Sequence, residues 1–187
     1  MKNIFKYLAV MAMGVALTGL VSCGDDPEPE PDNNNNGSPV VVDPTVQSGS
    51  YKFHYLDRDL QPGQTVYYYP TQEEADNEWA DVDFYIENLT GSNLETVMKV
   101  ERIGGPEAFD ALTICFDEIC KNGTCPWTSD AFTVEPGVND NLTIKVEYNP
   151  RSATEPGVYQ ITIGKGASLA DPQVMFLSMS GQVLQED

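Results

Sequence analysis

Apolar and polar residues alternate in short runs along most of the chain after about residue 40. Residues 81–87, 142–148 and 159–163 place an apolar side chain at every second position, 94–101 does the same except at Thr96, and 174–177 is apolar throughout. A period of two indicates strands with one buried and one solvated face, which is the pattern of antiparallel sheets. Clusters containing Gly, Pro or Asn separate these runs and predict turns. The pattern therefore predicts an all-β antiparallel sandwich of about seven to nine strands.

The region before the strands divides into two segments of different composition. Lys2 and Lys6 precede an apolar run over residues 7–21, which is shorter than the roughly 20 residues that span a bilayer as a helix. This order is typical of a cleavable signal peptide, here residues 1–22. Residues 24–38 are rich in Pro, acidic residues and Asn, so we expect residues 23–38 to be a disordered linker. The folded domain is then expected over residues 39–187.

The sequence at the end of the signal segment, Leu20-Val21-Ser22-Cys23, resembles the lipobox of bacterial lipoproteins. In that family the signal peptide is removed just before the cysteine, which carries the lipid, so the resemblance implies lipidation at Cys23. Stable anchoring needs more than one acyl chain, which this family provides. The acidic Gly24-Asp25-Asp26 that follows is similar to lipoproteins of the Bacteroidota phylum that are exported to the cell surface. The resemblance implies an outer-membrane protein that faces outward, with the periplasmic face as the alternative.

The charge of the chain excludes several kinds of partner. Without residues 1–22 the chain keeps 8 basic residues against 29 acidic ones, a net charge of −21. Such a surface repels nucleic acid and anionic headgroups, so no nucleic-acid role is expected and membrane attachment must come from the lipid on Cys23.

The cysteines after Cys23 are Cys115, Cys120 and Cys125. Asn122-Gly123 is the strongest two-residue hairpin signal and favours a type I′ turn. With that turn Cys120 faces Cys125 as a non-hydrogen-bonded pair with Cα atoms about 4.5 Å apart, within disulfide range. We therefore predict a Cys120–Cys125 disulfide and a free, buried Cys115. A redox pair or a zinc site is the alternative, although neither normally uses this spacing.

One motif refines the fold. In the segment from Glu155 to Ile161, an acid lies four residues before Tyr159 and Gly157 lies two before it. This resembles the tyrosine corner of immunoglobulin-like sandwiches, in which the phenol bonds to backbone slightly upstream. Residues 80–181 as a whole are similar to small immunoglobulin-like domains of Bacteroidota exported proteins, through 84–90, 120–125, Pro136-Gly137 and 157–163. The resemblance implies this architecture and a structural role for Tyr159 and Gly157.

Candidates for catalysis and metal binding are few. His54 is the single histidine and lies in a strand-like run beside aromatic residues, so we expect no enzyme. Acidic residues near 57–59, 81–83 and 139–141 offer oxygen ligands, but none matches a calcium loop, and we expect a solvated acidic surface without metal or cofactor. Residues 72–79 favour one or two helical turns.

The sequence does not identify a ligand, and three kinds of function stay open. We expect a cell-envelope lipoprotein that is a non-enzymatic binding or structural module, with protein or glycan partners at the loops 61–64, 73–79 and 120–127. The alternatives are an adhesion or fibre subunit that assembles through an edge strand, and a glycan-binding accessory protein. Trp79, Trp127 and the Tyr67–Pro70 stretch are the aromatic groups suited to sugar stacking.

Overall fold

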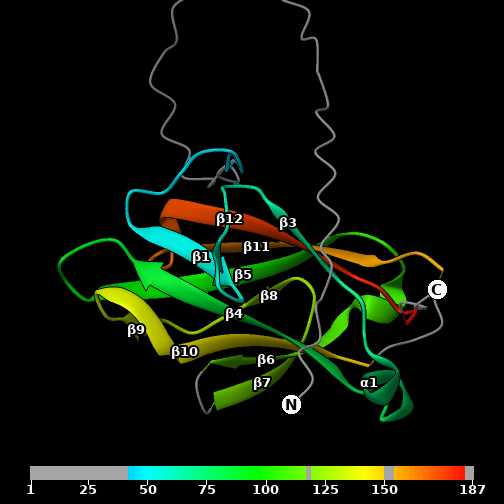
Figure 1. Cartoon of the computed structure of the whole chain (residues 1–187). Coiled ribbons are helices and arrows are strands. Elements are labelled where there is room, and N and C mark those ends of the chain that lie inside the picture. The colour runs from blue at the N-terminus through cyan, green and yellow to red at the C-terminus, as the bar shows by residue number, and fades with distance from the viewer. Residues whose placement is uncertain (1–41, 117–118, 150–153, 184–187) are drawn as a thin grey trace, which may run out of the picture. The chain divides into compact units, whose positions relative to one another are not determined.

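Two β-sheets make up the computed structural model of the chain, which describes residues 42–116, 119–149 and 154–183 (Figure 1). The first sheet has the order β2-β1-β4-β10-β6-β7, and the second has the order β3-β12-β11-β5-β8, with β9 also paired to β5. The elements are β1 (Tyr51–Tyr55), β2 (Arg58–Asp59), β3 (Thr65–Tyr68), α1 (Gln72–Asp76), β4 (Ala80–Asn88), β5 (Leu94–Gly104), η1 (Glu107–Phe109), β6 (Ala111–Phe116), β7 (Ile119–Thr124), β8 (Trp127–Thr128), β9 (Phe132–Val134), β10 (Gly137–Tyr148), β11 (Gly157–Lys165) and β12 (Ala170–Met179). The predicted signal peptide 1–22, Cys23 and the linker 23–38 lie outside the described residues.

The strand order is that of an immunoglobulin-like sandwich. If β1, β4, β5, β6, β10, β11 and β12 are taken as strands A to G, the first sheet contains A-B-E-D and the second contains G-F-C. These are the two sheets of a constant-type immunoglobulin domain. The predicted fold class, an all-β antiparallel sandwich, is confirmed. Among the strands that the structure describes, the exception to antiparallel pairing is β3, which runs parallel to β12.

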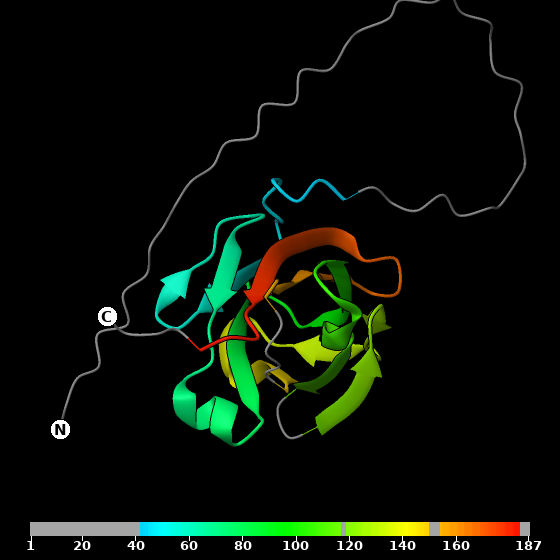
Figure 2. The same ribbon diagram turned by 90° about the vertical axis from the view of Figure 1, so that its right-hand side faces the viewer.

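The core lies between the two sheets and follows the alternation seen in the sequence. In β4 every second residue is buried, from Ala80 to Asn88, while the residues between them are half-buried. In β11 Tyr159, Ile161 and Ile163 are buried in the same way. Figure 2, turned by 90°, shows the strands of both sheets around this interior. Alternation in the sequence thus assigns side chains to the core because a strand turns successive residues to opposite faces.

The short helix α1 begins at a capping box. The Thr71 hydroxyl accepts from the Glu74 backbone N–H, and the Glu74 carboxylate accepts from the Thr71 N–H at 2.6 Å. This arrangement satisfies two backbone donors that a helix start otherwise leaves open. The Tyr68 hydroxyl also donates to Glu74 at 2.6 Å, which ties α1 to the end of β3. The helical turns expected over residues 72–79 are present.

Candidate functional site

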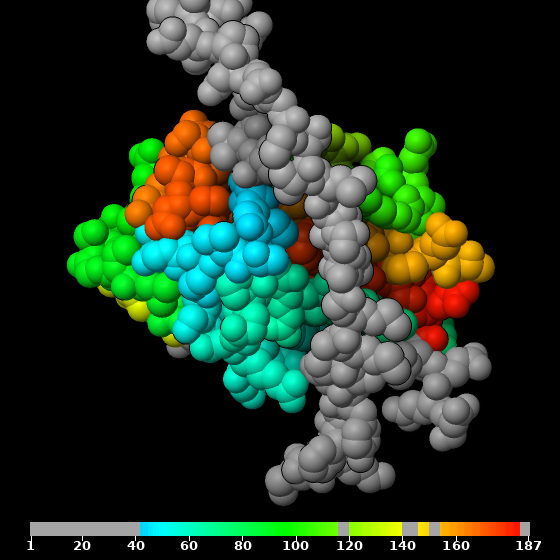
Figure 3. All heavy atoms as spheres, turned by 90° about the horizontal axis from the view of Figure 1, so that it is seen from above, coloured from blue at the N-terminus to red at the C-terminus, as the bar shows by residue number. Residues whose placement is uncertain are grey.

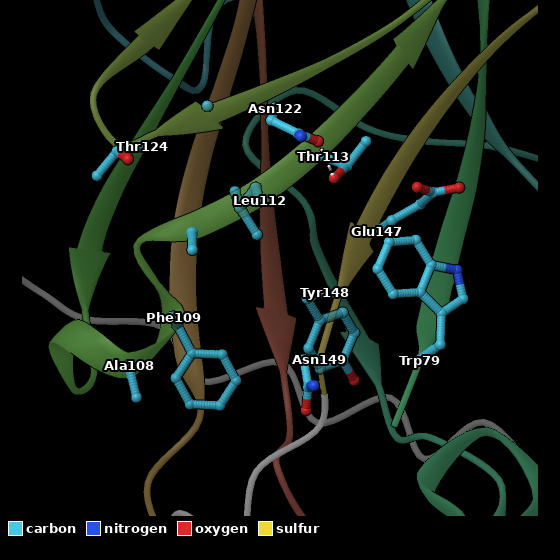
Figure 4. Close-up of a pocket in the computed structure, with 12 residues that line it drawn as sticks. Trp79, Ala108, Phe109, Leu112, Thr113, Asn122, Thr124, Glu147, Tyr148 and Asn149 are labelled. Carbon is cyan, nitrogen blue, oxygen red and sulfur yellow. Dashed lines mark hydrogen bonds between the residues drawn. The ribbon is translucent and has the colours of Figure 1, made fainter. Parts of the chain in front are cut away.

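A groove of about 580 Å³ opens at one end of the first sheet, where β10 and β6 separate. These strands pair from Ile144–Phe116 to Glu147–Thr113, whereas residues 111 and 112 of β6 pair with β7 alone. Figure 4 shows the side chains that line the opening. Its size is within the range of small-molecule sites, roughly 300–1,000 Å³.

The floor of the groove is apolar and firmly packed. Phe109, Leu112 and Tyr148 are at most 4% exposed, and the Phe109 and Tyr148 rings lie 6.2 Å apart. Tyr148 also donates a hydrogen bond from its hydroxyl to the Ser180 carbonyl at 3.0 Å. Burial raises the pKa of the Tyr148 phenol, so this group stays neutral over the physiological range. The floor is therefore a rigid, uncharged surface.

An arginine holds the loop that carries Phe109. Arg102 of β5 donates to the Gly105 carbonyl at 2.6 Å and to the Asp110 carboxylate, with one of the latter contacts at 3.3 Å. The hydrogen bond that Arg102 donates to the Asp110 carboxylate raises the pKa of the guanidinium above its usual value. Gly105 and Asp110 lie on either side of η1, so the bonds from Arg102 to both fix the position of this part of the floor.

Trp79 forms one wall and is the most exposed aromatic residue of the groove, at 45%. Its backbone N–H donates to the Glu74 carbonyl at 2.9 Å, which continues the turn of α1. The next residue, Ala80, pairs with Tyr148 and places the indole beside the end of β10. The wall is thus positioned by α1 on one side and by the sheet on the other.

Polar side chains surround the apolar floor. Thr113 and Asn122 are paired across β6 and β7, and the Thr113 hydroxyl donates to the Asn122 side-chain oxygen at 2.7 Å. This bond orients the Asn122 amide, whose two N–H groups are donors beyond it. Glu147 and Asn149 contribute a carboxylate and an amide from β10 and its end. The groove thus combines one exposed indole with hydrogen-bonding groups of both kinds.

The sequence indicated part of this site. Trp79 was expected as a contact residue, and the structure brings the loops 73–79 and 120–127 together in the groove, whereas 61–64 does not line it. Glu147 and Asn149 were missed, because an outward-facing residue in a strand carries no signal of what lies beside it in space. Trp127 lies close to Gly123, a residue that lines the groove, but is not itself part of the lining.

The predicted disulfide is wrong. Cys115 is bonded to Cys120, with Cα atoms 3.9 Å apart, and Cys125 is a free thiol. Asn122-Gly123 is not a turn but lies within β7, where Thr113 faces Asn122 and Cys115 faces Cys120. Gly123 is instead needed because the Trp127 ring lies against its backbone, where a Cβ would be 2.2 Å from Cδ1 of Trp127.

Cys125, the free thiol, follows the disulfide-bonded Cys120 by five residues. Its N–H donates to the Asp110 carbonyl at 3.0 Å, and burial raises the pKa of its thiol. Cys120 lies five residues earlier, and a strand of that length extends about 16 Å. A raised pKa lowers the thiolate fraction of Cys125, and the thiolate is the form that attacks a disulfide.

The predicted tyrosine corner takes a different form. Tyr159 near the start of β11 is fully buried, and its hydroxyl donates to the Phe109 carbonyl. That partner belongs to η1 and not to residues just before Tyr159, so the bond joins β11 to the C–D connection of the sandwich. Gly157 is required there, because a Cβ would lie 2.6 Å from the Phe109 ring. Burial raises the pKa of the Tyr159 phenol.

His54 of β1 lies between two carboxylates, near the edge of the first sheet that is opposite β6 and β7. Its Nε2 is 3.0 Å from Glu87 and its Nδ1 is 3.1 Å from Asp59. Both ring nitrogens are occupied by acidic partners, so the ring does not face a serine or cysteine nucleophile. Among the described residues no group of three or more His, Cys, Asp or Glu side chains is arranged to hold a metal ion. In the same part of the chain, no helix has the length and apolar character to cross a membrane.

Comparison with known proteins gives limited similarity. No protein-family model matches the sequence, and no curated protein matches it. Among solved structures, the N-terminal domain of PorA is 14% identical, with 71% of this chain and 98% of that chain covered and a TM-score of 0.46. A PapD-like (ASH) domain of human CEP192 is 11% identical, with 85% and 100% covered and a TM-score of 0.39. The fold assignment therefore rests on the strand order described above.

Proposed function

We propose that this chain is a lipid-anchored, non-enzymatic binding module of the cell envelope, held by Cys23 and facing outward, and that its groove binds an uncharged carbohydrate. The observation that carries the ligand class is the exposed indole of Trp79 above an apolar floor with amide, hydroxyl and carboxylate groups at the rim. The lipobox and the linker support the anchor.

The chemistry of the groove matches a sugar ring. The face of an indole packs against the C–H face of a pyranose, while the ring hydroxyls need both donors and acceptors at the edge. Thr113, Asn122, Asn149 and Glu147 provide these groups. The net charge of −19 disfavours acidic glycans, which leaves neutral glycans as the proposed class.

The ligand is tested by titrating the protein with neutral oligosaccharides of two to six units and measuring the heat of binding by calorimetry, a readout that does not depend on Trp79. Trp79→Ala is expected to weaken binding at least about tenfold, which corresponds to the loss of about 1.4 kcal/mol. Tyr69→Ala is the matched control, since Tyr69 is similarly exposed but does not line the groove. The assignment would be refuted if none of the neutral oligosaccharides bound, or if the Trp79→Ala variant bound them as tightly as the wild type.

The anchor is tested separately. Cys23→Ser is expected to abolish labelling by a palmitate analogue and to move the protein from the membrane to the soluble fraction. Protease treatment of intact cells distinguishes the outward from the periplasmic orientation. Unchanged membrane association of the Cys23 variant would disprove lipid anchoring and leave the ligand proposal unaffected.

A further inference from the structure

The edge strand β3 has an open side. It pairs with β12 in a parallel ladder in which Phe176 N–H donates to the Gln64 carbonyl and Ser180 N–H donates to the Tyr68 carbonyl, both at 2.9 Å. Backbone groups of alternate residues point to opposite sides of a strand, so those of Thr65 and Tyr67 point away from β12. Within the part of the chain that the structure describes, β3 pairs with no other strand.

The side chains of β3 alternate between the core and the outer face of the sheet. Val66 is buried in the core, whereas Tyr67 is 54% exposed and Tyr69 is 48% exposed. Figure 3 shows the teal part of the chain, to which β3 belongs, at the surface of the molecule. Among the described residues, no strand pairs with the outward N–H and C=O groups of Thr65 and Tyr67.

Other sheet edges are protected in ways that β3 is not. β2 is two residues long and both are charged and exposed. β7 carries Lys121, which forms an ion pair with Asp130, and is linked to β6 by the disulfide. β8 and β9 are two and three residues long. Charged and very short edges resist strand addition, and β3 has four residues without a charge.

The charge next to this edge identifies the partner. α1 follows β3 after three residues and exposes Glu73 and Asp76, and Glu78 lies just beyond it. The sequence contains no Lys or Arg from residue 60 to residue 98. A strand that lies along β3 and bears Lys or Arg at the end beside α1 gains ion pairs there in addition to backbone hydrogen bonds.

A second copy of the chain fits this edge less well. If two β3 strands paired antiparallel, residues 60–64 of one copy would lie beside α1 of the other, and these residues include no Lys or Arg. Each copy also carries a net charge of −19 before processing, so the copies repel one another.

We infer that β3 is an interaction surface that accepts an extended, basic peptide segment of another protein as an additional strand. The segment runs antiparallel to β3, with its Lys or Arg residues at its amino-terminal end beside Glu73 and Asp76. Hydrogen bonds to the backbone of Thr65 and Tyr67 hold it, and the acidic helix selects its charge. This surface is separate from the groove, none of whose lining residues belongs to β3.

The test uses proline at a position where the ladder to β12 is preserved. Tyr67→Pro removes an outward N–H and places the proline ring against the incoming strand, while Val66 and Tyr68 keep their bonds to β12. Tyr67→Ala is the matched control, since it removes the same side chain but keeps the N–H. Thr65→Pro is a second variant of the same kind, and circular dichroism melts establish that each variant is folded.

The probe is a synthetic peptide, Lys-Lys-Thr-Val-Thr-Val-Thr-Val, titrated into the folded domain by calorimetry at two salt concentrations. We expect the wild type and Tyr67→Ala to bind with Kd values within about threefold of each other, and Tyr67→Pro at least about tenfold more weakly. A Glu73→Gln/Asp76→Asn double variant is expected to bind more weakly and to lose most of the salt dependence. Trp79→Ala is expected to bind the peptide as the wild type does.

Three results would overturn the inference. The first is no saturable binding at millimolar peptide, and the second is equal binding by the Tyr67→Pro and Thr65→Pro variants. The third is a concentration-dependent dimer in sedimentation that Tyr67→Pro abolishes, because the edge then serves a second copy.

Discussion

The strands β3 and β7 lie at the edges of different sheets and are held in opposite ways. β7 is fixed by the Cys115–Cys120 disulfide, by the Lys121–Asp130 ion pair and by Trp127, which packs over Gly123. β3 has no such device along its length, and is held by β12, by the buried Val66 and by the Tyr68–Glu74 bond at its end. The comparison shows that the same sandwich stabilises one edge strand by a disulfide and an ion pair, and holds the other mainly by pairing with its neighbour in the sheet.

Gly123→Ala is expected to have the largest effect, on the protected edge. The new Cβ would lie 2.2 Å from Trp127, so the indole must move, and overpacking of this kind costs about 1–3 kcal/mol. Gly91→Ala is the control, because a Cβ there meets nothing within 4 Å, and its effect should stay within about 0.5 kcal/mol. Urea melts followed by tryptophan fluorescence measure both. Equal stability of the two variants would show that Trp127 does not lie on Gly123.

Loss of the disulfide is expected to be the next largest effect. The bond closes a loop of six residues, for which chain entropy predicts a stabilisation of about 2 kcal/mol. A Cys115→Ala/Cys120→Ala variant should lose about this amount, and Cys125→Ala should lose less. Peptide mapping without reduction should find Cys115 linked to Cys120 and should label Cys125. A linkage that includes Cys125 would restore the hairpin turn at Asn122-Gly123.

Tyr68→Phe tests the attachment at the end of β3. It removes the hydrogen bond to Glu74 and is expected to cost about 1 kcal/mol in the free energy of unfolding. Burial and the bond to Glu74 raise the pKa of the Tyr68 phenol above that of the unfolded chain. The stabilisation is therefore complete below about pH 10, the unfolded value, and is lost as the pH rises further. Melts from pH 8 to 11 should show wild type and variant converging, and a constant difference would contradict this account.

Tyr67→Pro is expected to have the smallest effect on stability, within about 0.5 kcal/mol of Tyr67→Ala, because the lost N–H faces solvent. Asn122→Pro in β7 would not serve as a comparison, because Asn122 is paired with Thr113 of β6. Chemical denaturation of the two Tyr67 variants measures the difference. A loss of several kcal/mol in the proline variant would mean that Tyr67 N–H is bonded within the fold.

Much of the fold could be predicted from the sequence, because alternation reports burial directly. The buried Val82, Phe84 and Ile86 occupy the positions that the pattern assigned to the core. The hairpin was mispredicted since Asn-Gly is a local signal, and the contact that determines Gly123 comes from Trp127, four residues further along. The partner of the Tyr159 hydroxyl is Phe109, fifty residues away, and no local motif encodes such a contact.

The parallel pairing of β3 with β12 sets an order of assembly. Val66 is opposite Leu177, 111 residues later, and β12 lies between β3 and β11 inside its sheet. A chain that enters a new compartment amino-terminus first cannot complete this sheet until its last strand arrives. Contacts so distant in sequence also form slowly. During that interval β3 has both edges unpaired, so a factor that shields extended segments would have its strongest effect before β12 has formed.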